Sequence, residues 1–353
     1  MAKAPIVEDA PEFDEVEGLL LPREQTVLYG HEQAETELLD AYRSQRFHHA
    51  WILGGPKGIG KATLAFRFAR FILEHPDRFS TPVAAANSLY VPPESRSSHM
   101  IAAGSHADLL HLRRPWDVKA KRFKRDLPVD EIRKTTAFFG STAAGGNWRI
   151  CIVDAADDMN QSAANALLKI LEEPPKQSLF ILLSHNPGRL LPTIRSRCRR
   201  LPMRKLEEAT IEHALSDMGS FQGGTSRALH ALADGSLRQA ALATNGGALD
   251  IAQEFSRLTE MLSNLDMIRV HSFADKVSAR GAEDAWNTFL ELARTFLSNQ
   301  LRKDASARPD ALVRWADLWE KVGRAASTAD ALNLDRKQVV LSFLIDLRKA
   351  HAG

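Results

Sequence analysis

One short glycine-containing run constrains the fold of this chain more than any other feature. Residues 55–61 read Gly-Pro-Lys-Gly-Ile-Gly-Lys, which fits the spacing G-x-x-x-x-G-K. The apolar run His49–Leu53 precedes it, and an amphipathic run follows it, with apolar residues at helical spacing (Leu64, Phe68, Phe71 and Ile72). Strand, loop and helix in this order predict a phosphate-binding loop whose backbone N–H groups and helix N-terminus face an anion. The candidate nucleotide-binding residues here are Gly55, Gly58, Gly60 and Lys61.

The residue after the lysine departs from the usual pattern. A Ser or Thr hydroxyl normally binds Mg²⁺ at this position, and here the residue is Ala62. Thr63 is the nearest hydroxyl and is kept among the candidates, although one helical step rotates a side chain by about 100°. We therefore expect a loop that can hold phosphate, with ATP and Mg²⁺ as the implied ligands, but that positions the metal poorly.

A second apolar run ends in an acid. Arg149–Asp154 reads RICIVD, which predicts a buried strand with Asp154 beside the phosphate loop, holding a metal-bound water. A buried strand with a capping aspartate is the alternative. Hydrolytic sites place a glutamate directly after the aspartate to activate water, and Ala155 stands there instead. With both the hydroxyl and the base missing, we expect little or no intrinsic ATP hydrolysis.

The pattern of apolar and polar residues changes near Pro202. Four strand candidates precede it: His49–Leu53, Asp108–Leu112, Arg149–Val153 and Leu179–Leu183. Amphipathic stretches lie between them, which predicts an α/β domain with a parallel sheet. A helix is expected over 162–173, and 75–105 reads as a loop or insertion. After Pro202 the pattern is helical throughout, with a single proline, and predicts a helical bundle.

Bulk composition narrows the class of protein. The chain has 353 residues, a formal net charge of +2 and only two cysteines, Cys151 and Cys198, with no spacing suited to a zinc site. The sequence contains no uninterrupted run of about 18 apolar residues, so no membrane span is predicted. The acidic N-terminus lacks the apolar core of a signal peptide. We expect a cytoplasmic multidomain protein without zinc, in which any nucleic-acid contact comes from a local patch.

Several motifs resemble those of the AAA+ clamp-loader subunits of bacterial DNA polymerase III and of replication factor C. They are LLPTIRSRC at 190–198, LLKILEEPP at 167–175, Tyr-Gly-His at 29–31 and ADGSLR at 233–238. The resemblance covers most of residues 20–240 in order. It implies an N-terminal extension (1–25), a P-loop α/β domain (26–204), a helical lid (205–246) and a helical collar domain (247–353).

The resemblance also implies roles for single residues. Arg197, preceded by Ser196, would be an arginine finger that stabilises charge in the ATP site of a neighbouring subunit. Ser184 would occupy the sensor 1 position and Arg238 the sensor 2 position of the chain's own nucleotide site. The alternative for Arg197 is an ordinary solvated arginine, since five arginines crowd residues 195–204.

The Ser-Arg-Cys run is intact, whereas the phosphate loop has Ala62 and the acidic strand is followed by Ala155. By the resemblance, this combination favours a stator that donates its arginine over a motor subunit of the gamma or tau type. The implied partners are gamma/tau and delta subunits, with the sliding clamp and primer-template DNA reached through the complex. No polymerase site is expected in this chain. The rival interpretations are an ATP-hydrolysing motor subunit of the same assembly and, more remotely, a P-loop small-molecule kinase.

The run 113–125 is the most basic part of the chain. It reads RRPWDVKAKRFKR, with seven basic residues, one acid and two interleaved aromatics. Such a run can follow a phosphate backbone, but a solvated loop or a protein-docking edge is the favoured interpretation from sequence.

Overall fold

The computed structural model divides into two compact units, residues 1–210 and 211–353. It describes residues 11–12, 15–16, 18–140, 148–219, 227–244, 247–304, 309–332 and 335–352. The helices of the first unit are α1 (Glu32–Arg43), α2 (Lys61–Glu74), α3 (Thr81–Ala85), α4 (Arg96–Ala102), α5 (Val129–Gly140), α6 (Gln161–Glu172) and α7 (Pro192–Arg197). Two short 3-10 turns are η1 (Ala156–Asp158) and η2 (Pro187–Arg189).

A five-stranded sheet organises the first unit. Its order is β2 (Leu109–Leu112), β5 (Arg149–Asp154), β6 (Ser178–Ser184), β1 (Ala50–Gly54) and β7 (Arg199–Pro202), with every pairing parallel. The predicted α/β fold with a parallel sheet is confirmed, and the four expected strands lie within a residue of their expected bounds. The carboxyl ends of β1, β5 and β6 adjoin, which places the phosphate loop, Asp154 and Ser184 at one edge.

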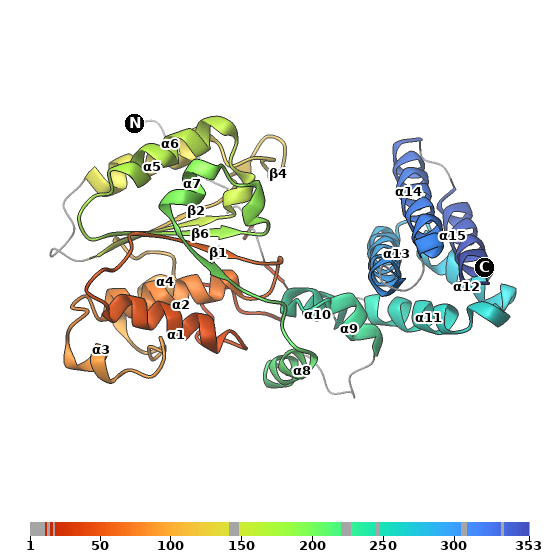
Figure 1. Ribbon diagram of the computed structural model, residues 1–353, viewed down its shortest axis with the longest axis horizontal. Helices are drawn as coiled ribbons and strands as arrows, with labels where there is room; N and C mark the ends of the chain where they lie inside the picture. The colour runs from red at the N-terminus through yellow and green to blue at the C-terminus, as the bar shows by residue number, and fades with distance from the viewer. Residues whose placement is uncertain are drawn as a thin grey trace, which may run out of the picture. The chain divides into compact units, whose positions relative to one another are not determined.

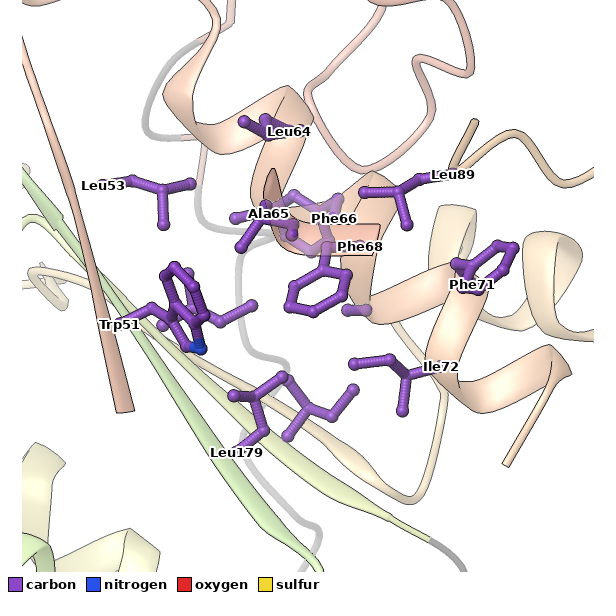
Figure 2. Close-up of a cluster of buried hydrophobic side chains, with 14 of the residues drawn as sticks. Trp51, Leu53, Leu64, Ala65, Phe66, Phe68, Phe71, Ile72, Leu89 and Leu179 are labelled. Atoms are coloured by element: carbon purple, nitrogen blue, oxygen red, sulfur yellow. The ribbon is translucent and has the colours of Figure 1, made fainter. Parts of the chain in front are cut away.

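Helices cover both faces of the sheet, with α1, α2 and α4 on one side and α5, α6 and α7 on the other (Figure 1). The first face buries a cluster in which Trp51 and Leu53 of β1 meet Leu64 and Phe68 of α2, as Figure 2 shows. The second face packs apolar residues of β5 and β6 against Leu167 of α6. The two strands at the centre of the site are therefore held from both sides.

The structure differs from expectation in two places before β5. The segment expected as a loop, 75–105, contains α3 and α4 and buries Val83, Leu89, Val91 and Ile101. The basic run forms a two-stranded antiparallel hairpin of β3 (Trp116–Asp117) and β4 (Arg122–Phe123).

The second unit is helical. Its helices are α9 (Arg227–Ala233), α10 (Leu237–Thr244), α11 (Ala248–Glu260), α12 (Met267–Ser278), α13 (Glu283–Asp304), α14 (Pro309–Leu332) and α15 (Arg336–Ala352), with η3 at Leu262–Asn264, and α8 (Glu208–Asp217) spans the boundary. Phe255, Phe273, Phe289 and Phe343 form an aromatic core.

The finer division of the helical part into a lid and a collar stays a prediction. Residues 220–226, inside the expected lid, and residues 245–246, at its expected end, lie outside the described residues. In the described ranges, no helix combines the length and apolar character that crossing a membrane requires.

Candidate functional site

The phosphate loop joins β1 to α2 and depends on its glycines in two ways. Gly58 and Gly60 have φ angles of 77° and 106°, where side chains with a Cβ are strained. Gly55 instead packs against the chain that follows β7, since a Cβ there would lie 2.3 Å from the carbonyl oxygen of Met203. The ring of His31 fixes the loop from the other side, with Nε2 2.7 Å from the carbonyl oxygen of Ile59.

Lys61 is folded into the loop, with only 4% of its surface exposed. Its ammonium donates hydrogen bonds to the carbonyl oxygens of Gly55, at 2.6 Å, and Pro56. Burial lowers the pKa of Lys61 to about 8, while the nearby carboxylates of Asp154 and Asp157 act in the opposite direction. The cation therefore lies near both acids and is held by two carbonyl groups of its own loop.

Asp154 lies at the end of β5 as predicted. Its Oδ2 is 3.6 Å from Nε2 of His111, which comes from the neighbouring strand β2. Burial acts to raise the pKa of Asp154, but His111, with smaller contributions from His185 and Lys61, holds it below its ordinary value. A carboxylate that stays ionised in this buried position suits cation binding.

Asp157 completes the site and was not among the predicted residues. It lies in η1, and its carboxylate accepts hydrogen bonds from the Ser184 hydroxyl at 2.9 Å and from the backbone N–H groups of His185 at 2.6 Å and Asn186 at 3.1 Å. Asp157 thereby ties the end of β5 to the end of β6. The sequence offered only a faint signal, an acid three residues beyond Asp154, because the contact exists only in the folded sheet.

The two substituted positions of the ATPase motifs carry no group that could do the missing chemistry. Ala62 begins the first turn of α2 and presents a methyl group, and Thr63 follows half-buried on the same helix. Ala155, at the position of the water-activating base, is buried with 3% of its surface exposed. The residues present fit a phosphate, but of the donors that would hold Mg²⁺ only Asp154 remains.

Arg197 ends α7, directly before Cys198 and β7. Its Nη1 donates to the carbonyl oxygen of Thr193 at 3.1 Å, and its Nη2 lies 2.9 Å from Oε1 of Glu172 at the end of α6. The side chain is 37% exposed. Ser196 is exposed, and its hydroxyl also donates to Thr193. The guanidinium is thus held by two partners while 37% of the side chain stays exposed.

Arg238 belongs to the other compact unit, in the first turn of α10, and is half-buried. Its assignment to sensor 2 stays a prediction. The structure brings together the loop glycines, Lys61, Asp154 and Ser184, all from the first unit.

Comparison with known proteins finds similarity to subunits of DNA polymerase III. The chain matches a family model described as DNA polymerase III, delta subunit, over residues 30–207. It is similar to DNA polymerase III subunit delta' of Pseudomonas aeruginosa, 38% identical over 150 residues (42% of this chain, 41% of the relative). It is also similar to subunit delta' of Bacillus subtilis, 34% identical over 181 residues (50% of this chain, 49% of the relative). The matched segments thus span about half of these relatives or less.

Two weaker similarities accompany these. DNA polymerase III subunit tau of Escherichia coli is 26% identical over 284 residues, covering 74% of this chain and 41% of the relative. A gamma subunit-related protein of Thermotoga maritima superimposes with a TM-score of 0.40 at 18% identity, covering 90% of this chain and 99% of that one. The first similarity agrees with the family match, and the second is too low to support an argument. Because the family model covers just over half of its length, this chain belongs to the DNA polymerase III delta subunit family.

Proposed function

We propose that this chain is a cytoplasmic clamp-loader subunit of DNA polymerase III that acts as a stator and donates Arg197 to the ATP site of a neighbouring subunit. The observation that carries the proposal is the placement of Arg197 at the end of a short helix, with 37% of its side chain exposed. Its relatives named delta' and tau support the assembly, and the motif around Arg197 supports the role.

The chain's own pocket supports a stator more than a motor. Ala155 cannot activate water and Ala62 cannot ligate a metal. Lys61 and Ser184 already donate to internal acceptors, so a bound phosphate must first displace those contacts. ATP with Mg²⁺ is the proposed ligand class for the loop glycines, Lys61 and Asp154. Binding there would stabilise this subunit, while the chemistry proceeds in the neighbour.

The proposed partners are gamma/tau and delta subunits, and through them the sliding clamp and primed DNA. In the neighbour's site Arg197 would meet the charge that develops on the transferred phosphoryl group, an effect worth about 10³–10⁵ in rate where it has been measured in other proteins. The Thr193 carbonyl and Glu172 would orient the guanidinium from behind.

The test is the clamp- and DNA-stimulated ATPase of a clamp loader reconstituted with this chain, comparing Arg197→Ala with the exposed control Arg200→Ala. Arg197→Ala is expected to assemble normally and to remove the turnover of the one site that it serves, by about 10³-fold or more. Arg200→Ala should leave turnover unchanged. If Arg197→Ala matches the wild type, the finger assignment is wrong.

The rival motor function makes the opposite prediction for the isolated chain. A motor subunit would hydrolyse ATP alone, in a reaction that Lys61→Ala abolishes. The stator proposal expects no turnover above background from the isolated chain.

A further inference from the structure

The basic run predicted to be a solvated loop is an ordered hairpin. The rings of Trp116 and Phe123 meet edge to face, with centroids 5.0 Å apart. At the turn, the Asp117 carboxylate accepts hydrogen bonds from the backbone N–H groups of Lys119 and Ala120, both at 3.0 Å. These contacts set the tip in one conformation, so its charges are presented on a defined surface.

The base of the hairpin is anchored to the site described above. Arg114 forms an ion pair with Asp158 of η1, Nε to Oδ2 at 3.1 Å, and Arg113 lies 2.6 Å from Oε2 of Glu12. Both base arginines therefore have a carboxylate partner, which Arg113 shares with Arg23. Asp158 directly follows Asp157, which holds Ser184, so the hairpin is tied to the edge of the sheet where the phosphate loop lies.

The tip, in contrast, carries more cations than its one carboxylate, Asp117, can neutralise. In the part of the chain that the structure describes, no ion pair within 4 Å neutralises any of the five exposed basic residues of the tip: Lys119, Lys121, Arg122, Lys124 and Arg125. The one acid of the run, Asp117, has its pKa lowered mainly by the hydrogen bond from the Ala120 N–H and further by the charges of Lys124 and Arg122, so its single negative charge offsets only part of the five positive charges. Because the whole chain has a net charge of only +2, this excess is local.

The chemistry of the tip distinguishes two kinds of partner. Protein interfaces are centred on apolar and aromatic residues and are poor in lysine. The tip offers a single exposed large apolar side chain, Val118, 55% exposed, among five cations. Interfaces with nucleic acids are polar and strongly positive, and their affinity comes from neutralised phosphates. The tip therefore fits a nucleic-acid backbone better than the edge of a protein.

We propose that the hairpin 116–125 is a binding site for the phosphate backbone of a nucleic acid, read by charge and without sequence preference. This property belongs to the chain by itself and goes beyond the proposed donation of Arg197 to a neighbour. Strand alternation places Arg122 and its cross-strand partner Asp117 on the face opposite to the Trp116–Phe123 pair, and the exposed lysines of the turn and of the end of the hairpin give the tip its positive excess.

The experiment measures binding of the full isolated chain to mixed-sequence DNA duplexes of about 25 base pairs at several salt concentrations. Five neutralised phosphates give a slope of log K against log salt of about −4.5, or a loss of about 500-fold between 50 and 200 mM salt. The variant with all five tip cations changed to alanine is expected to bind weakly and to lose most of that slope. The charge-matched control changes five basic residues of the second unit to alanine (Arg280, Arg302, Lys303, Arg324 and Lys349) and should keep both.

Three results would overturn the proposal: tip and control variants that bind DNA equally, a wild type whose slope is near zero, or a wild type that binds poly-glutamate of equal charge as tightly as DNA. The last would favour an acidic protein as the partner. Arg197→Ala should bind DNA like the wild type, so a failure of the finger assignment and a failure of the hairpin assignment are separable.

Discussion

The ion pair between Arg197 and Glu172 leads to the sharpest prediction about the proposed finger. Changing Glu172 to glutamine removes the charge that holds Nη2 at 2.9 Å, while the Thr193 carbonyl remains as an acceptor. A free arginine side chain has rotamer entropy worth about 2 kcal/mol. Without the ion pair, part of this entropy must be lost each time Arg197 enters the neighbour's site. Glu172 is therefore expected to act as a positioning residue whose loss slows the neighbour's reaction.

The structure bounds the size of the effect. The two side chains are 37% and 44% exposed, and exposed pairs are worth about 0.2–1 kcal/mol after screening by water and salt. Full transmission of that energy to the transition state corresponds to a fall in turnover of about 1.4- to fivefold. The fall should shrink as salt increases, because the pair is exposed.

The matched control is Glu173→Gln, one residue further along, where an exposed glutamate of equal charge makes no ion pair with another described residue. The assay is the stimulated ATPase of the reconstituted complex at saturating clamp and DNA, with kcat and KM for ATP separated. Glu172→Gln should lower kcat, leave KM for ATP unchanged, and have no further effect in an Arg197→Ala background. A Glu172→Gln variant that equals Glu173→Gln, or that is faster than the wild type, refutes the positioning role.

Three further predictions concern the chain's own pocket. Asp157→Ala should destabilise the first unit by about 2–4 kcal/mol, because three hydrogen bonds to a carboxylate are lost; urea-dependent hydrogen exchange of β6 measures this, and exposed Asp126→Ala, expected within about 0.5 kcal/mol of the wild type, is the control. Since the pKa of Lys61 is about 8 when folded and 10.5 ordinarily, the unfolded chain binds more protons between these values. The unfolding free energy should therefore rise with pH across that window by up to about 3 kcal/mol, and Lys61→Met should flatten the rise in urea titrations. Gly55→Ala should cost about 1–3 kcal/mol in thermal unfolding, because its Cβ would meet a backbone carbonyl, whereas Gly140→Ala meets no atom within 4 Å and should not destabilise.

The sequence predicted the interior of the sheet well. Strands covered on both faces are continuous apolar runs, and β1, β5 and β6 each appear as one. Edge elements have no such signature. The strand β7 reads Arg-Arg-Leu-Pro, and three of its four residues are exposed, so its charges resemble those of a loop. The two strands of the hairpin have two residues each, which is too short for an alternating apolar pattern to appear in the sequence.

The candidate site was predicted where a motif fixes its spacing and missed where folding creates it. The loop glycines and Lys61 were proposed from the spacing of the loop motif, Asp154 from the acidic end of a predicted strand, and Ser184 from the family resemblance. His111 and Asp157 contribute through strand pairing and a short turn after β5. A histidine within an apolar run, or an acid three residues past a strand, does not by itself indicate such contacts.

The pairing of β7 with β1 has a consequence for any assembly that this chain joins. Only Cys198 separates Arg197 from β7, and β7 runs beside β1 from Arg199 opposite Trp51 to Pro202 opposite Gly54, where the phosphate loop begins. The Arg199 guanidinium lies over the Trp51 ring at 4.8 Å and adds to this pairing. The proposed finger lies just before β7 and the chain's own phosphate loop just after β1, so the pairing of these two strands holds the two at a constant separation. If one subunit docks at Arg197 and another at the phosphate loop, this chain is a rigid spacer between them. Changes in the curvature of the assembly must then arise at the contacts between subunits.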